Sequence, residues 1–152
     1  MEELMTILQE TNHCLLEVTD VEQRKYEATL KNNVVSVEDC MKEEQVLLLK
    51  LKGLDKKREK VLQAFGKEDA TFREVIEDLP KDQKIPLESL FQQMQTNLKK
   101  YKEVERNARS ALEFHLHEID KKLEKMQGSK GSVYEGHGKV KQPTKSFTSR
   151  RV

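Results

Sequence analysis

Two histidines and two acidic residues lie close together in the C-terminal third of the sequence, and such residues can bind a metal ion. They are His115, His117, Glu118 and Asp120. Metal-binding histidines on a helix usually stand four residues apart, because that spacing brings both rings to one side. His115 and His117 are two apart and would point to nearly opposite sides. We therefore expect no metal site and interpret both as solvated histidines or as neighbours of an apolar seam.

A second candidate chemistry is phosphate binding by the glycines and lysines near the C-terminus. Gly138 and Lys139 resemble the end of a phosphate-binding loop, but Val133 stands where that pattern needs its first glycine, and no strand precedes it. The sequence also offers no set of nucleophile, general base and orienting group. We expect neither a cofactor nor an enzyme activity.

The composition is typical of long helices rather than of a thick globular core. Charged and hydrophobic residues each make up 36% of the 152 residues, and there is no Trp. Ala, Glu, Lys, Leu and Arg account for 71 residues, a share close to that of long helices and coiled coils. Helices that each bury one stripe need no more apolar residues than this. The sequence predicts a single all-α domain.

The longest helical pattern runs from about Pro86 to Gln127. Its apolar residues alternate at spacings of four and three, which places them on one face of a helix, and Glu105 is the one charged member. The stripe consists of Leu87, Phe91, Met94, Leu98, Tyr101, Glu105, Ala108, Leu112, Leu116, Ile119, Leu123 and Met126. Two spacings of four stand side by side between Ala108 and Leu116. Such a stutter unwinds a coiled-coil seam locally, so we expect the partner of this helix to change there.

Three further helices are predicted before it, over residues 1–32, 37–65 and 72–79. Asn32 and Asn33 suit a helix end, Val34 and Val35 suit an extended link, and Ser36 with Asp39 resembles a capping box. The polar and charged residues 22–25 interrupt the stripe of the first helix. The second helix has a clear seam, formed by Leu47, Leu51, Leu54, Arg58, Val61 and Phe65. Short links favour antiparallel neighbours. Residues 1–127 should form a coiled-coil-like antiparallel bundle of three long helices and one short one.

Residues 128–152 have a different composition, with four glycines, several Ser and Thr residues and scattered lysines. They carry a net charge of +5, whereas residues 1–127 carry −4. This segment cannot bury enough apolar surface to offset its ordering entropy, so we expect a flexible, disordered basic tail. Its charges are scattered and the body is acidic, so we expect no nucleic-acid binding.

The cysteines and the N-terminus bear on the cellular compartment. Cys14 and Cys40 lie in helical patterns without a second Cys at metal-binding spacing, so we expect reduced, packed thiols. The sequence opens with Met1, Glu2 and Glu3, and its longest aliphatic run is only residues 46–49. We therefore expect a cytoplasmic chain with no signal peptide and no membrane insertion.

The predicted helix lengths leave part of the longest helix without a partner. Two helices of about thirty residues span about 45 Å, whereas forty-two residues span about 63 Å. The second and third helices lead into the start of the long helix, so its C-terminal end should be the uncovered one. That end carries Leu116, Ile119, Leu123 and Met126. An exposed apolar stripe of this kind indicates either a partner-binding site or self-association into a homo-oligomer.

Three segments together resemble the FlgN-type flagellar export chaperones. Residues 41–65, with Glu43, Glu44, Leu47, Leu48, Leu51, Leu54, Arg58 and Leu62, resemble the second helix of that family. Residues 101–123, with Asn107 before Leu112, Leu116 and Ile119, resemble its long C-terminal helix. Residues 133–138 (Val-Tyr-Glu-Gly-His-Gly) resemble its tyrosine-glycine motif, with His137 where Asp or Asn is more familiar. The first helix matches only in its spacing.

The resemblance implies a cytoplasmic, non-enzymatic chaperone. Such proteins hold hook-associated proteins, the subunits of the hook-filament junction, and bring them to the flagellar type III export apparatus. The family roles would place client binding on Leu112, Leu116, Ile119, Leu123 and Met126, and docking to the export gate on Tyr134. The alternative function is that of a self-associating coiled-coil structural or adaptor protein without a client.

Overall fold

The computed structural model describes residues 1–131, and this part of the chain consists of four α-helices and contains no β-strand. The helices are α1 (Glu2–Leu30), α2 (Val34–Ala64), α3 (Phe72–Glu77) and α4 (Lys81–Gly131). The chain divides into two compact units, Met1–His115 and Leu116–Val152. The helix α4 begins in the first unit and ends in the second. The predicted all-α class, with three long helices and one short one, is confirmed.

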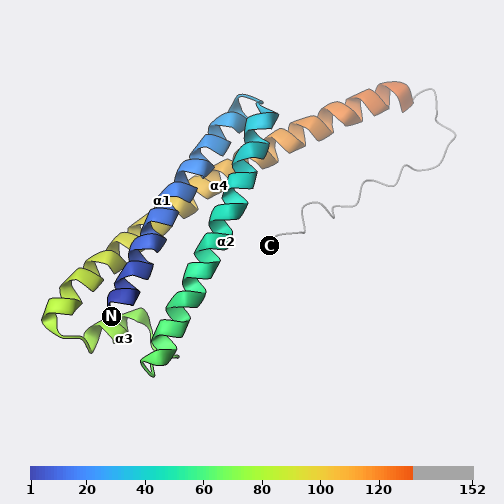
Figure 1. The fold of residues 1–152 in the computed structure, drawn as a ribbon. Helices are drawn as coiled ribbons and strands as arrows, with labels where there is room; N and C mark the ends of the chain where they lie inside the picture. Colours follow the sequence, from blue (N-terminus) through green and yellow to red (C-terminus); the bar gives the residue numbers. More distant parts are fainter. Residues whose placement is uncertain (132–152) are drawn as a thin grey trace. The chain divides into compact units, whose positions relative to one another are not determined.

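In the first unit the three long helices run up, down and up (Figure 1). Cys14 of α1 donates a hydrogen bond from its Sγ to the carbonyl of Leu47 in α2 at 3.5 Å. On another side of α1, the Asn12 side chain donates to the carbonyl of Leu90 in α4 at 3.1 Å and accepts from Asn97 at 3.2 Å. These bonds fix both neighbours of α1. The predicted antiparallel bundle is confirmed, and both cysteines are free and buried.

The main hydrophobic core lies at the end of the bundle where α1 begins, and the short helix α3 closes that end (Figure 1). Phe72 of α3 stacks on Phe91 of α4 with ring centroids 4.7 Å apart. The side chain of Thr71 and that of Glu74 form a capping box that starts α3. The core cluster contains Leu4, Ile7, Leu8, Val61, Leu62, Phe72, Val75, Ile76 and Leu87.

The turn between α1 and α2 is shorter than predicted. Asn32 adopts a positive φ of 54°, which Asn tolerates better than most residues. The Asn33 side chain then accepts a hydrogen bond from the Ser36 N–H at 3.1 Å and caps α2. The predicted extended link at Val34 and Val35 and the capping box at Ser36 are therefore wrong. One Asn satisfies the first turn, so both valines lie inside the helix.

The predicted end of α2 at residue 65 agrees with the structure to within one residue, but the predicted packing of Phe65 in the seam does not. Gly66 has a φ of 68°, a conformation that glycine adopts without strain. Phe65 stands at the helix end and its side chain is 51% exposed, so its predicted place in the seam is wrong. Arg58, another member of the predicted seam, pairs with Asp55 of the same helix at 2.8 Å.

The longest helix, α4, begins earlier and ends later than the predicted residues 86–127. The carbonyl of Pro80 accepts hydrogen bonds from the N–H groups of Gln83 and Lys84, so the helix starts directly after this proline. Pro86 lies inside the helix. Residues 128–131 are helical, which corrects the first four residues of the predicted tail. The rest of that tail lies outside the described residues.

Candidate functional site

Within the first compact unit the apolar stripe of α4 is mostly covered by other helices, and its one exposed member there is Leu98, at 37%. Leu87 is fully buried and Ala108 is 1% exposed. Phe91 and Met94 are partly buried against the core, and Leu112, one turn before the end of the unit, is half-buried. This part of the stripe closes the chain's own bundle, as its spacing predicted.

The stripe continues into the second unit, but there its members are exposed to solvent. Residue 128 is the last consecutive residue whose side-chain burial the structure describes. Between Leu116 and that residue, no member of the stripe is buried. The exposed fractions are 54% for Leu116, 52% for Ile119, 50% for Leu123 and 58% for Met126. The four residues are three or four apart, so they share one face of α4. From here on, the name α4 stripe means these four residues, Leu116, Ile119, Leu123 and Met126, together with the half-buried Leu112 that precedes them. The covered residues before Leu112 are not part of it.

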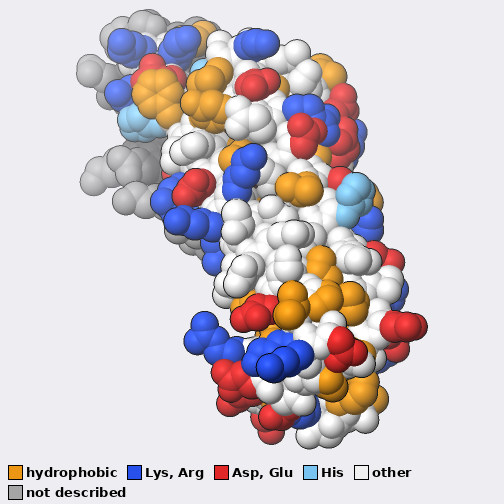
Figure 2. Space-filling view, turned by 90° about the vertical axis from the view of Figure 1, so that its left-hand side faces the viewer, with side chains coloured by type: hydrophobic (Ala, Val, Ile, Leu, Met, Phe, Trp, Pro, Cys, Tyr) orange, Lys and Arg blue, Asp and Glu red, His pale blue; other side chains and the backbone are white. Residues whose placement is uncertain are grey.

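Charged residues of both signs border the α4 stripe. Helical spacing places Asp120 and Lys122 on either side of it, and both are exposed. On the face of the molecule shown in Figure 2, small hydrophobic groups likewise lie among Lys, Arg, Asp and Glu side chains. This arrangement can bind an amphipathic helix through apolar contacts, with its direction set by the flanking charges. Client binding by the α4 stripe stays a prediction, and Tyr134 lies outside the described residues.

The ring of His115 is nearly perpendicular to the ring of Phe114, the preceding residue, with centroids 6.0 Å apart. Across residues 1–131, no three His, Cys, Asp or Glu side chains come together as a possible metal site.

A shallow groove near the end of α1 was not predicted from the sequence. It is lined by Tyr26 and Leu30 of α1 and by Asn107, Ser110, Ala111, Phe114 and His115 of α4. Leu30 is 53% exposed and Phe114 is 61% exposed. Phe114 falls outside the heptad-like spacing of the stripe, so only its size and apolar character could have signalled this surface.

The structure also reveals a buried polar cluster, formed by Glu22, Lys25 and Glu44, where sequence reasoning saw only an interrupted stripe. Glu22 of α1 has no exposed surface, and its Oε1 accepts a hydrogen bond from Lys25 Nζ at 3.1 Å. The same Nζ donates to Glu44 of α2 at 2.7 Å. Glu22 lies seven residues after Leu15, so helical periodicity could have placed it on the buried face.

Burial and like charge shift the proton affinities in this cluster. Desolvation, followed by the hydrogen bond with Glu44, raises the pKa of Glu22 to about 7. Burial and then the charges of Glu22 and Glu44 raise the pKa of Tyr101 in α4 to about 12. Burial would lower the pKa of Lys25, but its bond to Glu44 and the charge of Glu22 leave it raised. Lys25 therefore stays protonated, whereas Glu22 changes its charge near neutral pH.

The raised pKa of Glu22 predicts a specific pH dependence of stability. The folded chain holds this proton up to about pH 7, whereas the unfolded chain releases it near its ordinary value of 4.5. Stability from this group is therefore greatest at acidic pH and falls as pH rises from about 4.5 to about 7, by about 1–3 kcal/mol. We expect Glu22→Gln to be more stable than wild type at pH 8 and equal to it at pH 5, measured by urea unfolding. The same stability difference at both pH values would contradict the prediction.

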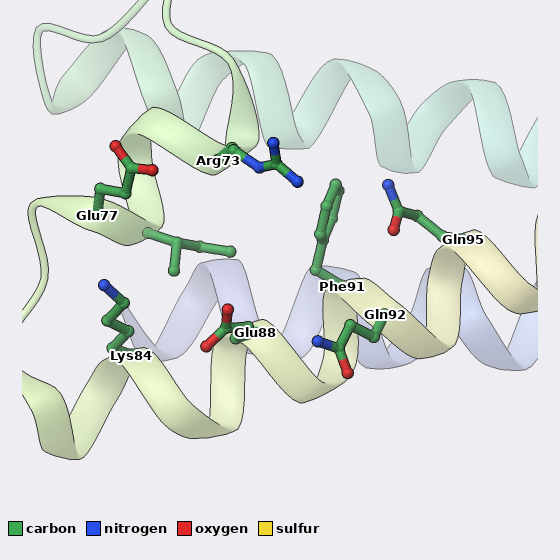
Figure 3. A pocket seen from close by; sticks show the side chains of 8 residues that line it. Arg73, Glu77, Lys84, Glu88, Phe91, Gln92 and Gln95 are labelled. Atoms are coloured by element: carbon green, nitrogen blue, oxygen red, sulfur yellow. The ribbon is translucent and has the colours of Figure 1, made fainter.

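A second hollow lies between α3 and the start of α4 (Figure 3). Arg73 and Glu77 extend from α3, and Lys84 and Glu88 extend from α4. Ile76, Phe91, Gln92 and Gln95 complete the lining. Two cations and two carboxylates therefore line this hollow together with apolar and amide side chains.

Comparison with known proteins places these features in a family. Within residues 1–131, none of the helices contains an apolar stretch long enough to cross a membrane. Searches of curated proteins and of solved structures each found no match. The model of the FlgN protein family matches residues 1–142, which include the tyrosine-glycine segment 133–138 as well as all four helices. The chain therefore belongs to the FlgN family of flagellar export chaperones.

Proposed function

We propose that this chaperone binds hook-associated proteins through the α4 stripe and delivers them from the cytoplasm to the flagellar type III export apparatus. The observation that carries the proposal is the change along a single helix face. Ala108 is 1% exposed, whereas Leu116, two turns further along, is 54% exposed. The sequence keeps its apolar residues where the chain's own helices no longer cover them, and such surfaces are typical of partner binding.

The proposed client segment is an amphipathic helix of the hook-associated protein. An apolar stripe at spacings of three and four fits the matching stripe of another helix. Covering half-exposed leucines yields only part of the roughly 1.5–3 kcal/mol that complete burial of each would give. Ordering a client helix opposes binding. The affinity should therefore be moderate, which suits a chaperone that must release its cargo.

Light scattering after gel filtration tests this function against the alternative of self-association. The chain alone should elute as a monomer and should form a complex of higher mass with a purified hook-associated protein. A stable homo-oligomer that ignores the client would support a self-associating coiled-coil protein instead, because the α4 stripe would then be covered by a second copy.

For Tyr134 we propose docking to the export gate, a role supported by the family match, which includes this residue. Tyr134→Ala should bind a hook-associated protein with unchanged affinity but should secrete it poorly, because docking and client binding use different segments. Tyr134→Phe is the matched control, since it keeps the ring that would fill a pocket. The measurement is the amount of hook-associated protein in the culture medium. Normal secretion by the Tyr134→Ala strain would contradict this role.

A further inference from the structure

The outward face of α2 carries a second stripe that the proposed function does not use. Val46, Leu49, Gly53, Lys56 and Lys60 follow one another at spacings of three and four, so they lie on one side of the helix. All five are exposed, with Val46 at 67% and Leu49 at 69%. The seam that faces α1 contains other residues, such as Leu54 and Val61, which are buried.

Gly53 has no role within the first compact unit that would explain its presence. It lies in the interior of a 31-residue helix, where glycine is less favourable than alanine. Its φ is not positive, since Gly66 is the one glycine with a positive φ among the described residues. A Cβ at Gly53 would meet nothing within 4 Å. A glycine in open space beside exposed Leu49 leaves room for the backbone of another molecule to approach closely.

The same stretch of α2 is positively charged, although the rest of the helical body is acidic. Residues 46–60 contain six basic and two acidic side chains, whereas the rest of residues 1–127 contains 16 basic and 24 acidic ones. One of the two acidic residues, Asp55, pairs with Arg58. Within the described part of the chain, Lys56 and Lys60 take part in no ion pair. Their charges remain available to a partner.

We propose that this face of α2 is a docking surface for an acidic amphipathic helix of a partner protein. The partner's apolar side chains would pack on Val46 and Leu49, its backbone would cross at Gly53, and its carboxylates would lie beside Lys56 and Lys60. A nucleic-acid duplex would match the lysines but would gain nothing from the apolar residues and the glycine. A second copy of this face would bring lysines against lysines in a parallel pairing and lysines against Val46 and Leu49 in an antiparallel pairing, and neither arrangement supplies the lysines with carboxylates.

The probe is a synthetic helical peptide with a leucine stripe flanked by glutamates, titrated into the isotopically labelled full chain. A peptide with lysines in place of the glutamates is the control. The acidic peptide should shift the amide signals of residues 46–60 in NMR spectra, and the lysine peptide should not. Lys56→Glu with Lys60→Glu should weaken binding about tenfold or more. The matched pair Lys99→Glu with Lys100→Glu, exposed on α4, should leave it unchanged.

Gly53→Ala separates close approach from a purely structural role. The substitution should raise the midpoint of thermal unfolding, because alanine favours the helix, and it should weaken binding of the acidic peptide. Equal binding of both peptides, no shift in residues 46–60, or unchanged affinity of Gly53→Ala would overturn the proposal. Shifts confined to residues 112–128 would also overturn it while leaving the α4 stripe intact as a client surface.

Discussion

Replacing Leu116 and Leu123 together by Asp should abolish measurable binding of hook-associated proteins without changing the stability of the chaperone. Both side chains are at least half exposed in the free chain, so substitution there should change unfolding by no more than about 0.5 kcal/mol. In a complex, each Asp would forfeit about half of the roughly 1.5–3 kcal/mol that complete burial of a leucine gives, and it would also place an unpaired carboxylate against the apolar stripe of the client, which costs further free energy. The lost burial at the two positions alone corresponds to at least about tenfold weaker binding. Isothermal calorimetry and thermal unfolding measure the two quantities.

Phe114→Asp is the matched control for this pair. Phe114 is also an exposed apolar residue of α4, at 61%, but it lies off the α4 stripe. The Phe114→Asp variant should therefore retain client binding. If Phe114→Asp abolished binding and the double substitution did not, the client surface would be the groove beside Tyr26 and Leu30 rather than the α4 stripe.

Lys25→Met should cause the largest loss of stability among single substitutions of charged residues. The lysine is the cation between Glu22, which has no exposed side-chain surface, and Glu44, which is 18% exposed. Its removal leaves two carboxylates close together in the bundle with their counter-charge gone. Breaking a buried pair in this way costs about 3–5 kcal/mol, a large share of a typical stability of about 5–15 kcal/mol. Urea unfolding at pH 8 measures the loss.

The neighbouring residue Arg24 provides the control. Its guanidinium pairs with Asp20 at 3.1 Å and with Glu43 at 2.6 Å, but all three side chains are about half exposed or more. Such surface pairs contribute about 0–1 kcal/mol, so Arg24→Met should be mild. Lys25→Met should also be milder at pH 5 than at pH 8, because a proton on Glu22 then removes one of the two charges. Equal losses for Lys25→Met and Arg24→Met would contradict the description of the cluster as buried.

Most of the fold could be predicted because each long helix buries one regular stripe. The helix order, the up-down-up arrangement and the stop at Gly66 all follow from periodicity and from turn chemistry. The boundaries at Asn33 and Pro80 could not, because they depend on which of several possible caps is used. Asn33 accepts the Ser36 N–H itself, and the Pro80 carbonyl starts α4 five residues before the predicted residue.

The candidate site divides in the same way. The end of the covered stripe could be predicted from helix lengths and from the stutter at Ala108, since both depend on spacing alone. The cluster around Glu22 was missed because it depends on three residues from two helices meeting in the bundle. From the sequence alone, Glu22 appears only as a charged residue that interrupts the apolar stripe of α1. Its burial can be understood only once its partners, Lys25 and Glu44, are known.

The central claim is that a client helix covers the α4 stripe, and hydrogen exchange measured with and without a purified hook-associated protein tests it most directly. The account predicts that the client slows amide exchange in residues 112–126 and leaves α1 and α2 unchanged. If the client slowed amide exchange in other parts of the chain but did not slow it in residues 112–126, the result would contradict the claim.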